Sequence, residues 1–116
     1  MAAYAFFDTL EITDADGMER YRQAVRATVE RHGGRYLGVG GACEVVEGEW
    51  RPVFPVLIEF PGMEAARRWY GSEAYRDLKA LRLAAARCNA VFIDGSGLER
   101  VGGGRRVGQP RADGLP

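Results

Sequence analysis

The alternation of apolar and polar positions begins almost at the N-terminus, in "AYAFFDTLEI". Successive side chains of a strand point to opposite faces of a sheet. Phe6 and Asp8 therefore share one face, and Phe7 lies on the other, with mostly apolar neighbours on both. The stretch predicts a central strand that is covered on both sides.

The spacing changes to a helical one in "TDADGMERYRQAVRATVERHGG". Thr13 followed by Asp16 resembles a capping box with Asp in place of the usual Glu, and Gly33 and Gly34 can end a helix in the left-handed conformation. The apolar positions between these signals fall on one stripe, which is formed by Met18, Tyr21, Val25, Val29 and His32. The stretch predicts a helix of about five turns with arginines on its outer face.

Glycines interrupt the next strand-like stretch, "RYLGVGGACEVVEGEW". The alternation continues across Gly40 and Gly41 without a change of parity, which favours one long strand when the usual connection rules are applied. The alternative is a hairpin, because Gly-Gly can form a two-residue turn. In the preferred interpretation "EGEWRP" makes the turn and "VFPVLIEF" is the returning strand.

Two helices and a strand complete the pattern. Pro61 and Gly62 end the preceding strand, 63–70 has the spacing of a short helix, and Ser72 can cap a second helix. The apolar stripe predicted for the second helix is Ala74, Leu78, Leu81, Ala85 and Cys88. "NAVFID" is the last strand. The order strand, helix, strand, strand, helix, strand predicts an α+β fold: a ferredoxin-like antiparallel sheet with helices on one face.

Composition divides the chain into two parts. Residues 1–95 carry the periodic pattern and form the expected ferredoxin-like domain. Residues 96–116 are rich in glycine and arginine and have little to bury, which is typical of a flexible C-terminal tail.

Charge and special residues narrow the function. The 16 basic and 16 acidic side chains cancel, so no nucleic acid partner is expected. No apolar run approaches the ~20 residues of a membrane span, and the N-terminus lacks a secretory pattern, so a cytoplasmic location is expected. One histidine and two separated cysteines give no ligand spacing, so we expect no metal and no cofactor.

Several segments together resemble the family called domain of unknown function 1330. They are "HGGRYLGVGG", "VVEGEW", "VLIEFPGMEAARRWYGSEAYRDLKALR" and "NAVFIDG", which occur in this order within residues 4–95. The resemblance implies a dimeric α/β barrel, in which two ferredoxin-like subunits join their sheets as a homodimer. Relatives of this architecture include cofactor-free monooxygenases, lactone isomerases, polyketide cyclases, haem enzymes and plain ligand-binding domains, so the fold does not fix the function. Gly62 departs from the family, which more often has a serine cap there.

The glycines do not match a nucleotide site. A phosphate-binding loop needs a strand, a glycine loop and then a helix N-terminus, whereas these glycines lie between strand-like runs. Gly38, Gly40 and Ala42 instead leave one face of the predicted strand bare. That face makes room for a small ligand if it looks toward the helices. Close backbone packing or a bend is the alternative.

Five side chains are candidates for catalysis: Tyr21, His32, Asp8, Glu59 and Arg82. Tyr21 could face a wet pocket or be an ordinary core tyrosine, and His32 could be a general base or merely end its helix. Asp8 and Glu59 lie in apolar strands, where a carboxylate needs a partner. Arg82, which follows Tyr75 by two helical turns, is the cation expected to pair with one of them or to hold a ligand anion.

The substrate-binding candidates are Gly38, Gly40, Trp69, Tyr70 and Tyr75. The first hypothesis is a cofactor-free homodimeric enzyme of isomerase, cyclase or monooxygenase type. Its substrate would be a small acidic or phenolic organic compound. The alternative is a non-catalytic dimer that binds a small-molecule ligand in the same pocket.

Overall fold

The computed structural model describes residues 2–95 of the 116-residue chain, so the predicted tail lies outside the described residues. The elements are β1 (Ala3–Ile12), α1 (Ala15–Arg31), β2 (Arg35–Val39), β3 (Pro55–Phe60), α2 (Met63–Tyr70), α3 (Glu73–Ala85) and β4 (Ala86–Asp94). No helix within the described part of the chain has the length and apolar character needed to cross a bilayer.

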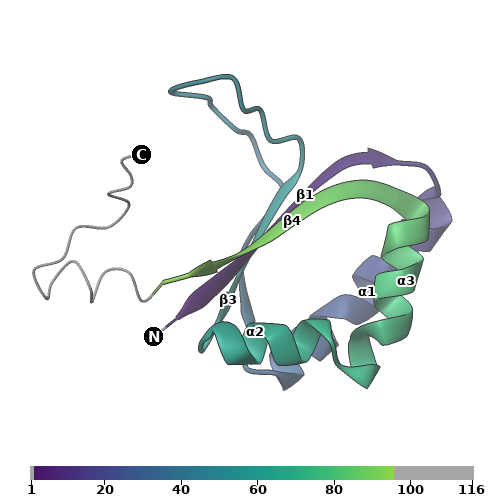
Figure 1. Ribbon diagram of the computed structural model, residues 1–116. Coiled ribbons are helices and arrows are strands. Elements are labelled where there is room, and N and C mark those ends of the chain that lie inside the picture. The colour runs from purple at the N-terminus through teal and green to yellow at the C-terminus, as the bar shows by residue number, and fades with distance from the viewer. Residues whose placement is uncertain (1, 96–116) are drawn as a thin grey trace, which may run out of the picture.

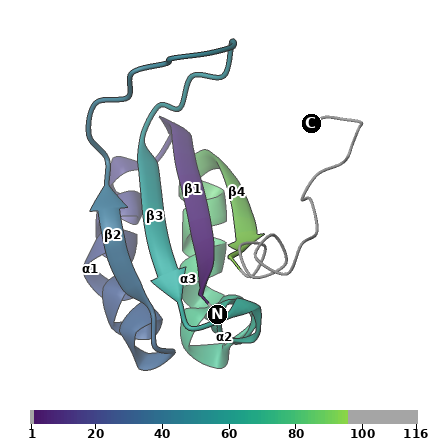
Figure 2. The same cartoon turned by 90° about the vertical axis from the view of Figure 1, so that its left-hand side faces the viewer.

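The strands form one antiparallel sheet in the order β2-β3-β1-β4. Figure 2 shows this sheet nearly face-on with α1 and α3 behind it, and Figure 1 shows the helices gathered on one side. This is the ferredoxin-like α+β arrangement that the order of elements predicted.

The register of the strands separates a helix-covered face from a helix-free face. Phe7 stands opposite Val56 on the face that the helices cover, whereas Phe6 stands opposite Leu57 on the other. Asp8 shares the helix-free face with Phe6, because strand side chains alternate. β1 was predicted to be covered on both sides, but the helices of this chain cover only one of its two faces.

The core lies between the helices and the Phe7 face, and aromatic rings make its centre. Trp69 of α2 is fully buried, with its ring centroid 4.2 Å from that of Tyr75 and 5.5 Å from that of Phe60. The Trp69 indole Nε1 donates a hydrogen bond to Thr28 Oγ1 at 2.9 Å, so the one polar atom of the indole is satisfied.

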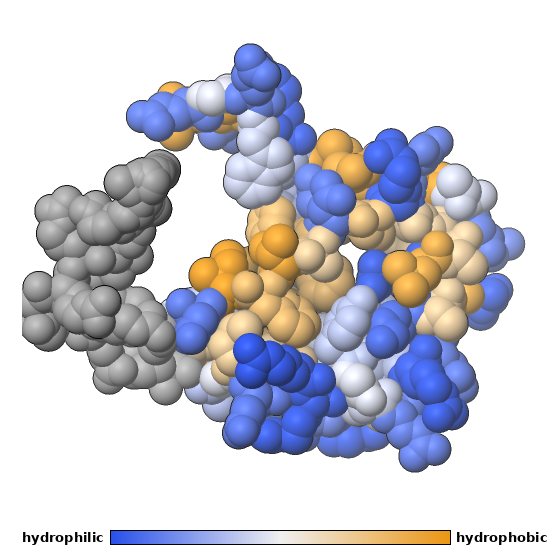
Figure 3. Space-filling model, viewed as in Figure 1, coloured by the Kyte–Doolittle hydropathy of each residue, from blue (hydrophilic) through white to orange (hydrophobic). Residues whose placement is uncertain are grey.

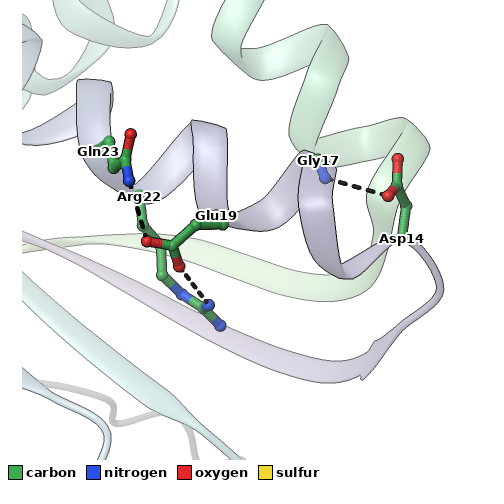
Figure 4. Close-up of polar contacts among 5 residues, drawn as sticks. All are labelled: Asp14, Gly17, Glu19, Arg22 and Gln23. Carbon is green, nitrogen blue, oxygen red and sulfur yellow. Dashed lines mark hydrogen bonds and ion pairs between the residues drawn. The ribbon is translucent and has the colours of Figure 1, made fainter.

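The helix ends follow the capping signals with one correction. Asp14, not Thr13, is the N-cap of α1, and its carboxylate accepts a hydrogen bond from the Gly17 backbone N–H at 3.0 Å (Figure 4). The Thr13 hydroxyl instead donates to the Ala85 carbonyl and ties α1 to α3. Ser72 caps α3 as predicted, by accepting from the Tyr75 backbone N–H.

The long strand predicted across the glycines is wrong, and so is the two-residue hairpin. Strand β2 ends at Val39, because Gly40 and Gly41 adopt φ angles of 70° and 101°, which lie in the left-handed region and break the extended backbone. Residues 40–54 then form a long loop, which Figure 1 shows projecting beyond the sheet and away from the helices. Parity alone could not reveal this break, because a loop can keep an alternating sequence.

Asp8 fixes the end of this loop. Its Oδ1 atom accepts hydrogen bonds from the backbone N–H groups of Val53 at 2.9 Å and Phe54 at 2.8 Å. Earlier in the loop, the Trp50 ring packs edge-on against Phe6, with centroids 5.6 Å apart. The buried carboxylate therefore has a structural task at the base of the loop.

The face that α3 presents to the core matches the predicted stripe only in part: Ala85 is buried and Leu78 packs against the core as predicted, whereas Tyr75 and Arg82 were not in that stripe. Its buried residues are Tyr75, Arg82 and Ala85, while Leu81 is only half-buried. The helix ends at Ala85 and passes directly into β4, three residues before the predicted start at Asn89. The charged side chain of Arg82 is therefore buried on the inner side of this helix.

Candidate functional site

A cavity of about 250 Å³ lies between α1, α3 and the helix-covered face of the sheet. Its walls are largely apolar and include Phe7, Val25, Phe54 and Ile58. The polar side chains of Tyr21 and Arg82 also line it. An apolar cavity with a few convergent polar groups is the usual form of a small-molecule site.

A chain of hydrogen bonds joins the polar side chains. Arg82 Nε donates to Tyr75 Oη at 3.2 Å, and Tyr75 Oη lies 2.8 Å from Tyr21 Oη. Tyr75 and Arg82 are seven residues apart on α3, so they lie on the same side of that helix two turns apart. Tyr21 reaches the chain from α1.

Arg82 has no carboxylate partner among the residues that the structure describes. Its residue is only 4% exposed, and within residues 2–95 no Asp or Glu forms an ion pair with it. The predicted pairing with Asp8 or Glu59 is wrong. Asp8 binds the loop amides, and Glu59 accepts from Arg35 at 2.7 Å. Both acids lie on the helix-free face, so neither can meet a side chain that enters from α3.

The site holds a charged guanidinium beside two neutral phenols. Burial raises the pKa of Tyr21 well above its usual value, and the nearby Tyr75 raises it further. Burial also raises the pKa of Tyr75, although the Arg82 charge acts against this. For Arg82, burial lowers the pKa, but the Tyr75 and Tyr21 oxygens outweigh it and leave the pKa raised. At neutral pH the three side chains Tyr21, Tyr75 and Arg82 can therefore donate hydrogen bonds, but none of the three is a base.

Two further arginines stand at the rim. Arg22 and Arg26 of α1 line the cavity while remaining exposed. Arg22 lies 3.7 Å from Glu19, whose carboxylate also accepts from Gln23 (Figure 4), and Arg26 donates to Glu30 at 2.9 Å. These acids lie on the helix outside the cavity lining. In the described part of the chain, the lining contains three arginines and no carboxylate, so it favours an anion.

The other catalytic candidates lie elsewhere. His32 is the C-cap of α1, where its Nδ1 atom lies 2.9 Å from the Thr28 carbonyl oxygen, and it does not line the cavity. Asp8 and Glu59 are separated from the cavity by the sheet. Of the five predicted catalytic residues, the structure brings Tyr21 and Arg82 together.

The substrate-binding candidates divide in the same way. Gly40 backs onto the Phe54 ring, which is a cavity wall, while Gly38 pairs with Leu57 on the helix-free face. Trp69 is core. Tyr70 does not line the cavity and packs under Lys79, whose Nζ lies 4.2 Å from the ring centroid. Tyr75 takes part through its hydroxyl group.

Sequence reasoning missed Arg22, Arg26, Tyr36 and Phe54. Arg22 and Arg26 each follow a member of the inner stripe of α1, so they lie beside that stripe and not opposite it. Burial raises the pKa of Tyr36 to about 12, so this phenol is also neutral. No sequence pattern could identify Phe54 as a cavity residue, because its position depends on the conformation at the end of the loop.

Comparison with known proteins agrees with this architecture. Residues 2–96 match the sequence profile of the family described as a domain of unknown function (DUF1330). The chain belongs to this family. The DUF1330 resemblance drawn from the sequence segments is thereby confirmed, and no functionally curated protein matches the chain.

Solved structures share the fold of this DUF1330 domain at low sequence identity. The RPA0582 protein of unknown function from Rhodopseudomonas palustris has a TM-score of 0.66 at 15% identity, covering 80% of this chain and 81% of its own. A dimeric ferredoxin-like protein of unknown function from Jannaschia sp. CCS1 has a TM-score of 0.55 at 14% identity, with 81% and 99% covered. SnoaB, a cofactor-independent oxygenase from Streptomyces nogalater, has a TM-score of 0.53 at 12% identity, with 81% and 91% covered. Such identities establish the shared fold alone.

Proposed function

We propose that this DUF1330 protein binds a small organic anion in the cavity and acts on it as a cofactor-free enzyme. The observation that carries the proposal is Arg82, a buried cation that lines the cavity and has no carboxylate partner within residues 2–95. A buried charge is costly unless it is paired. A ligand carboxylate or phenolate supplies the missing partner.

The size of the cavity supports a compound built on a single ring. An apolar cavity of about 150 Å³ is enough to hold benzene, and this one measures about 250 Å³. Phe7, Tyr36 and Phe54 offer aromatic surface to such a ring. Arg82 offers a planar fork of donors to its acidic group.

The catalytic part of the proposal rests on where charge can develop. A hydroxyl donor and a guanidinium held in an apolar cavity can stabilise an enolate or phenolate that forms during reaction. The reaction types that use such an intermediate without a cofactor include isomerisation, cyclisation and O2-dependent oxidation. The fold shared with SnoaB, which is described as a cofactor-independent oxygenase, supports this class.

A non-catalytic binding protein is the second candidate, and one observation favours it. Among the described residues, no Asp, Glu or His lines the cavity, and the pKa of Tyr21 is raised by burial. The cavity thus lacks a general base of its own. In an enzyme of this kind, the substrate would have to enter already ionised or lose its proton to water.

The protein is further proposed to be a homodimer that joins the helix-free faces of two sheets. Val91 and Ile93 are about half exposed on this face. Figure 3, which views the sheet nearly edge-on, shows apolar residues between the loop and the helices. Trp50 of the loop is also 66% exposed. The description of the Jannaschia protein as dimeric supports this arrangement.

Calorimetry with matched ligands tests the anion site. We expect benzoate to bind and benzyl alcohol, a neutral compound of similar size, to bind much more weakly. Arg82→Gln should abolish this preference, whereas Arg68→Gln, which removes an exposed arginine of α2, should keep it. Equal binding of both compounds, or no effect of Arg82→Gln, would contradict the proposal.

The enzyme and the binding protein can be separated through the natural ligand. Native mass spectrometry of the purified protein should reveal a bound organic acid or phenol. Incubating an excess of that compound with the protein in air should convert it if the protein is an enzyme. Quantitative recovery of the unchanged compound would favour the binding protein.

A further inference from the structure

We propose that Tyr75 is a positioning residue that couples Arg82 to Tyr21, so that the Tyr21 hydroxyl is the group that donates to the ligand oxygen. The site then selects a phenolate or enolate, and this inference rests on the proposed anion site. Arg82 acts in this arrangement through Tyr75 as well as through its own charge.

The direction of the hydrogen bonds follows from what each group can do. An arginine side chain donates and never accepts, so the Tyr75 oxygen accepts from Arg82 Nε. Tyr75 is fully buried, and its own hydroxyl hydrogen needs an acceptor. Within the part of the chain that the structure describes, the acceptor within reach is Tyr21 Oη at 2.8 Å. Tyr75 therefore donates to Tyr21.

This direction leaves the hydrogen of Tyr21 available. Tyr75 is the hydrogen-bond partner that the described residues give to the Tyr21 hydroxyl, and that contact uses the Tyr21 oxygen as acceptor. Tyr21 lines the cavity, so its hydrogen can be directed at a ligand there. Hydrogen bonds in such a chain polarise one another, which makes the last donor stronger than an isolated phenol.

The surroundings of the Tyr21 hydroxyl favour a ligand whose oxygen is ionised. Tyr75 and Arg82 face it from α3, Tyr36 faces it from β2, and Arg22 and Arg26 of its own helix line the same cavity. The charged groups in the lining are positive, while Glu19 and Glu30, the partners of Arg22 and Arg26, lie outside it. The phenols are neutral because burial raises their pKa values. A donor of this kind makes a short, strong hydrogen bond to an oxyanion. The aromatic walls fit the planar ring or double bond from which a phenolate or enolate oxygen projects.

The probe that tests the coupling is 4-nitrophenol, because its ionised form absorbs visible light and reports its own charge while bound. In the wild-type protein we expect bound 4-nitrophenol to ionise at a lower pH than the free compound. Tyr75→Phe keeps the ring and removes the coupling hydroxyl. We expect it to raise the apparent pKa of the bound probe by about one unit, a tenfold loss of preference for the phenolate.

Two further variants keep the test independent of folding. Tyr21→Phe removes the final donor and should raise the apparent pKa of the bound probe at least as much as Tyr75→Phe. Tyr4→Phe makes the same chemical change on the opposite face of the sheet and should leave it unchanged. Affinity for 4-nitrotoluene, which has no ionisable oxygen, should be equal in the wild type and the three variants. A substitution that merely damaged the structure of the cavity would lower this affinity as well.

The outcomes separate the two proposals. If the wild-type protein binds phenolate more tightly than phenol but Tyr75→Phe does not change the preference, the coupling is wrong and the anion site stands. If bound 4-nitrophenol ionises at the same pH as the free compound, the directed donor is wrong. If neither 4-nitrophenol nor benzoate binds, the anion site itself is wrong, and the coupling with it.

Discussion

The guanidinium carbon of Arg82 lies 5.2 Å from the centre of the Phe7 ring, on the face of the sheet opposite to Asp8. Within residues 2–95 the cation thus contacts an aromatic ring and a phenol oxygen, and no carboxylate forms an ion pair with it. An aromatic face compensates a buried charge only partly. We therefore expect the loss of this charge to reduce ligand affinity more than it reduces the stability of the protein.

Arg82→Met tests this expectation. Methionine fills much of the same space without a charge, and Tyr75 keeps its hydrogen bond to Tyr21. The free energy of unfolding should stay unchanged or rise by up to about 4 kcal/mol, as it can when buried ion pairs are replaced by apolar groups of similar volume. Benzoate affinity should fall at least tenfold. Urea unfolding and calorimetry on the same samples give both values.

The opposite pattern would point to a structural ion pair. Removing one member of a buried pair costs about 3–5 kcal/mol, because the other charge is left without a partner. A loss of this size in Arg82→Met would mean that Arg82 serves stability. Arg82→Lys is the companion variant: it keeps the charge but not the fork, so it should fold normally and still bind benzoate more weakly.

Alkaline pH should destabilise the protein through its buried phenols. The pKa values of Tyr21 and Tyr75 are raised by burial, and that of Tyr36 is raised to about 12. A group whose pKa is higher in the folded state contributes stability below its unfolded pKa, which is about 10 for tyrosine. That stability is lost as the pH rises above about 10, by about 1.4 kcal/mol per pH unit for each such tyrosine.

Urea unfolding at several pH values measures this slope. We expect the free energy of unfolding to be level near neutral pH and to fall above about pH 10. The double variant Tyr21→Phe/Tyr75→Phe should have a shallower slope in the alkaline range, whatever its stability at neutral pH. An unchanged slope would mean that these two phenols ionise as readily in the folded protein as in the unfolded one.

Periodicity predicted the elements well where a regular pattern ends in a clear signal, and less well at the end of β2 and at the junction of α3 and β4. Strand β1 and helix α2 have the predicted bounds, and Gly33, with φ 82°, ends α1 as expected. The site was harder to predict because it depends on which face of β1 the helices cover. Both faces are apolar, so the sequence could not place Phe7 inside and Asp8 outside.

The error over Arg82 has the same origin. Glu59 stands opposite Tyr4 and so shares the helix-free face with Asp8. Both expected partners therefore lie on the face that the helices do not cover, which the sequence had left undecided. The spacing between Tyr75 and Arg82 was the reliable signal, because it depends on a single helix.

The glycines after β2 can be tested as a matched pair. Gly40 has φ 70°, and a Cβ atom there would lie 2.6 Å from the Phe54 ring, whereas a Cβ atom on Gly38 would meet nothing within 4 Å. Gly40→Ala should lower the free energy of unfolding by about 1–2 kcal/mol from the left-handed backbone, with a further loss from the clash. Gly38→Ala should be neutral or slightly stabilising.

Ligand binding extends this test to the cavity. Phe54 is a wall of the cavity, so Gly40→Ala must displace that wall or the loop that carries it. We expect weaker benzoate binding in Gly40→Ala and unchanged binding in Gly38→Ala. Equal binding by both variants would show that the cavity does not depend on the position of Phe54.

The helix-free face provides the last prediction. Ile93 lies on this face opposite Tyr4 and is 49% exposed, while Leu83 is 61% exposed on α3. If the sheets of two subunits join, a glutamate at position 93 is buried twice in a symmetric interface, where an unpaired charge is strongly unfavourable. Stable interfaces of this kind bury on the order of 2,000 Å² or more. Ile93→Glu should therefore be a folded monomer at micromolar concentration by light scattering, and Leu83→Glu should remain a dimer. A wild-type protein that is itself monomeric, or a dimer that survives Ile93→Glu, would show that this face is not the interface.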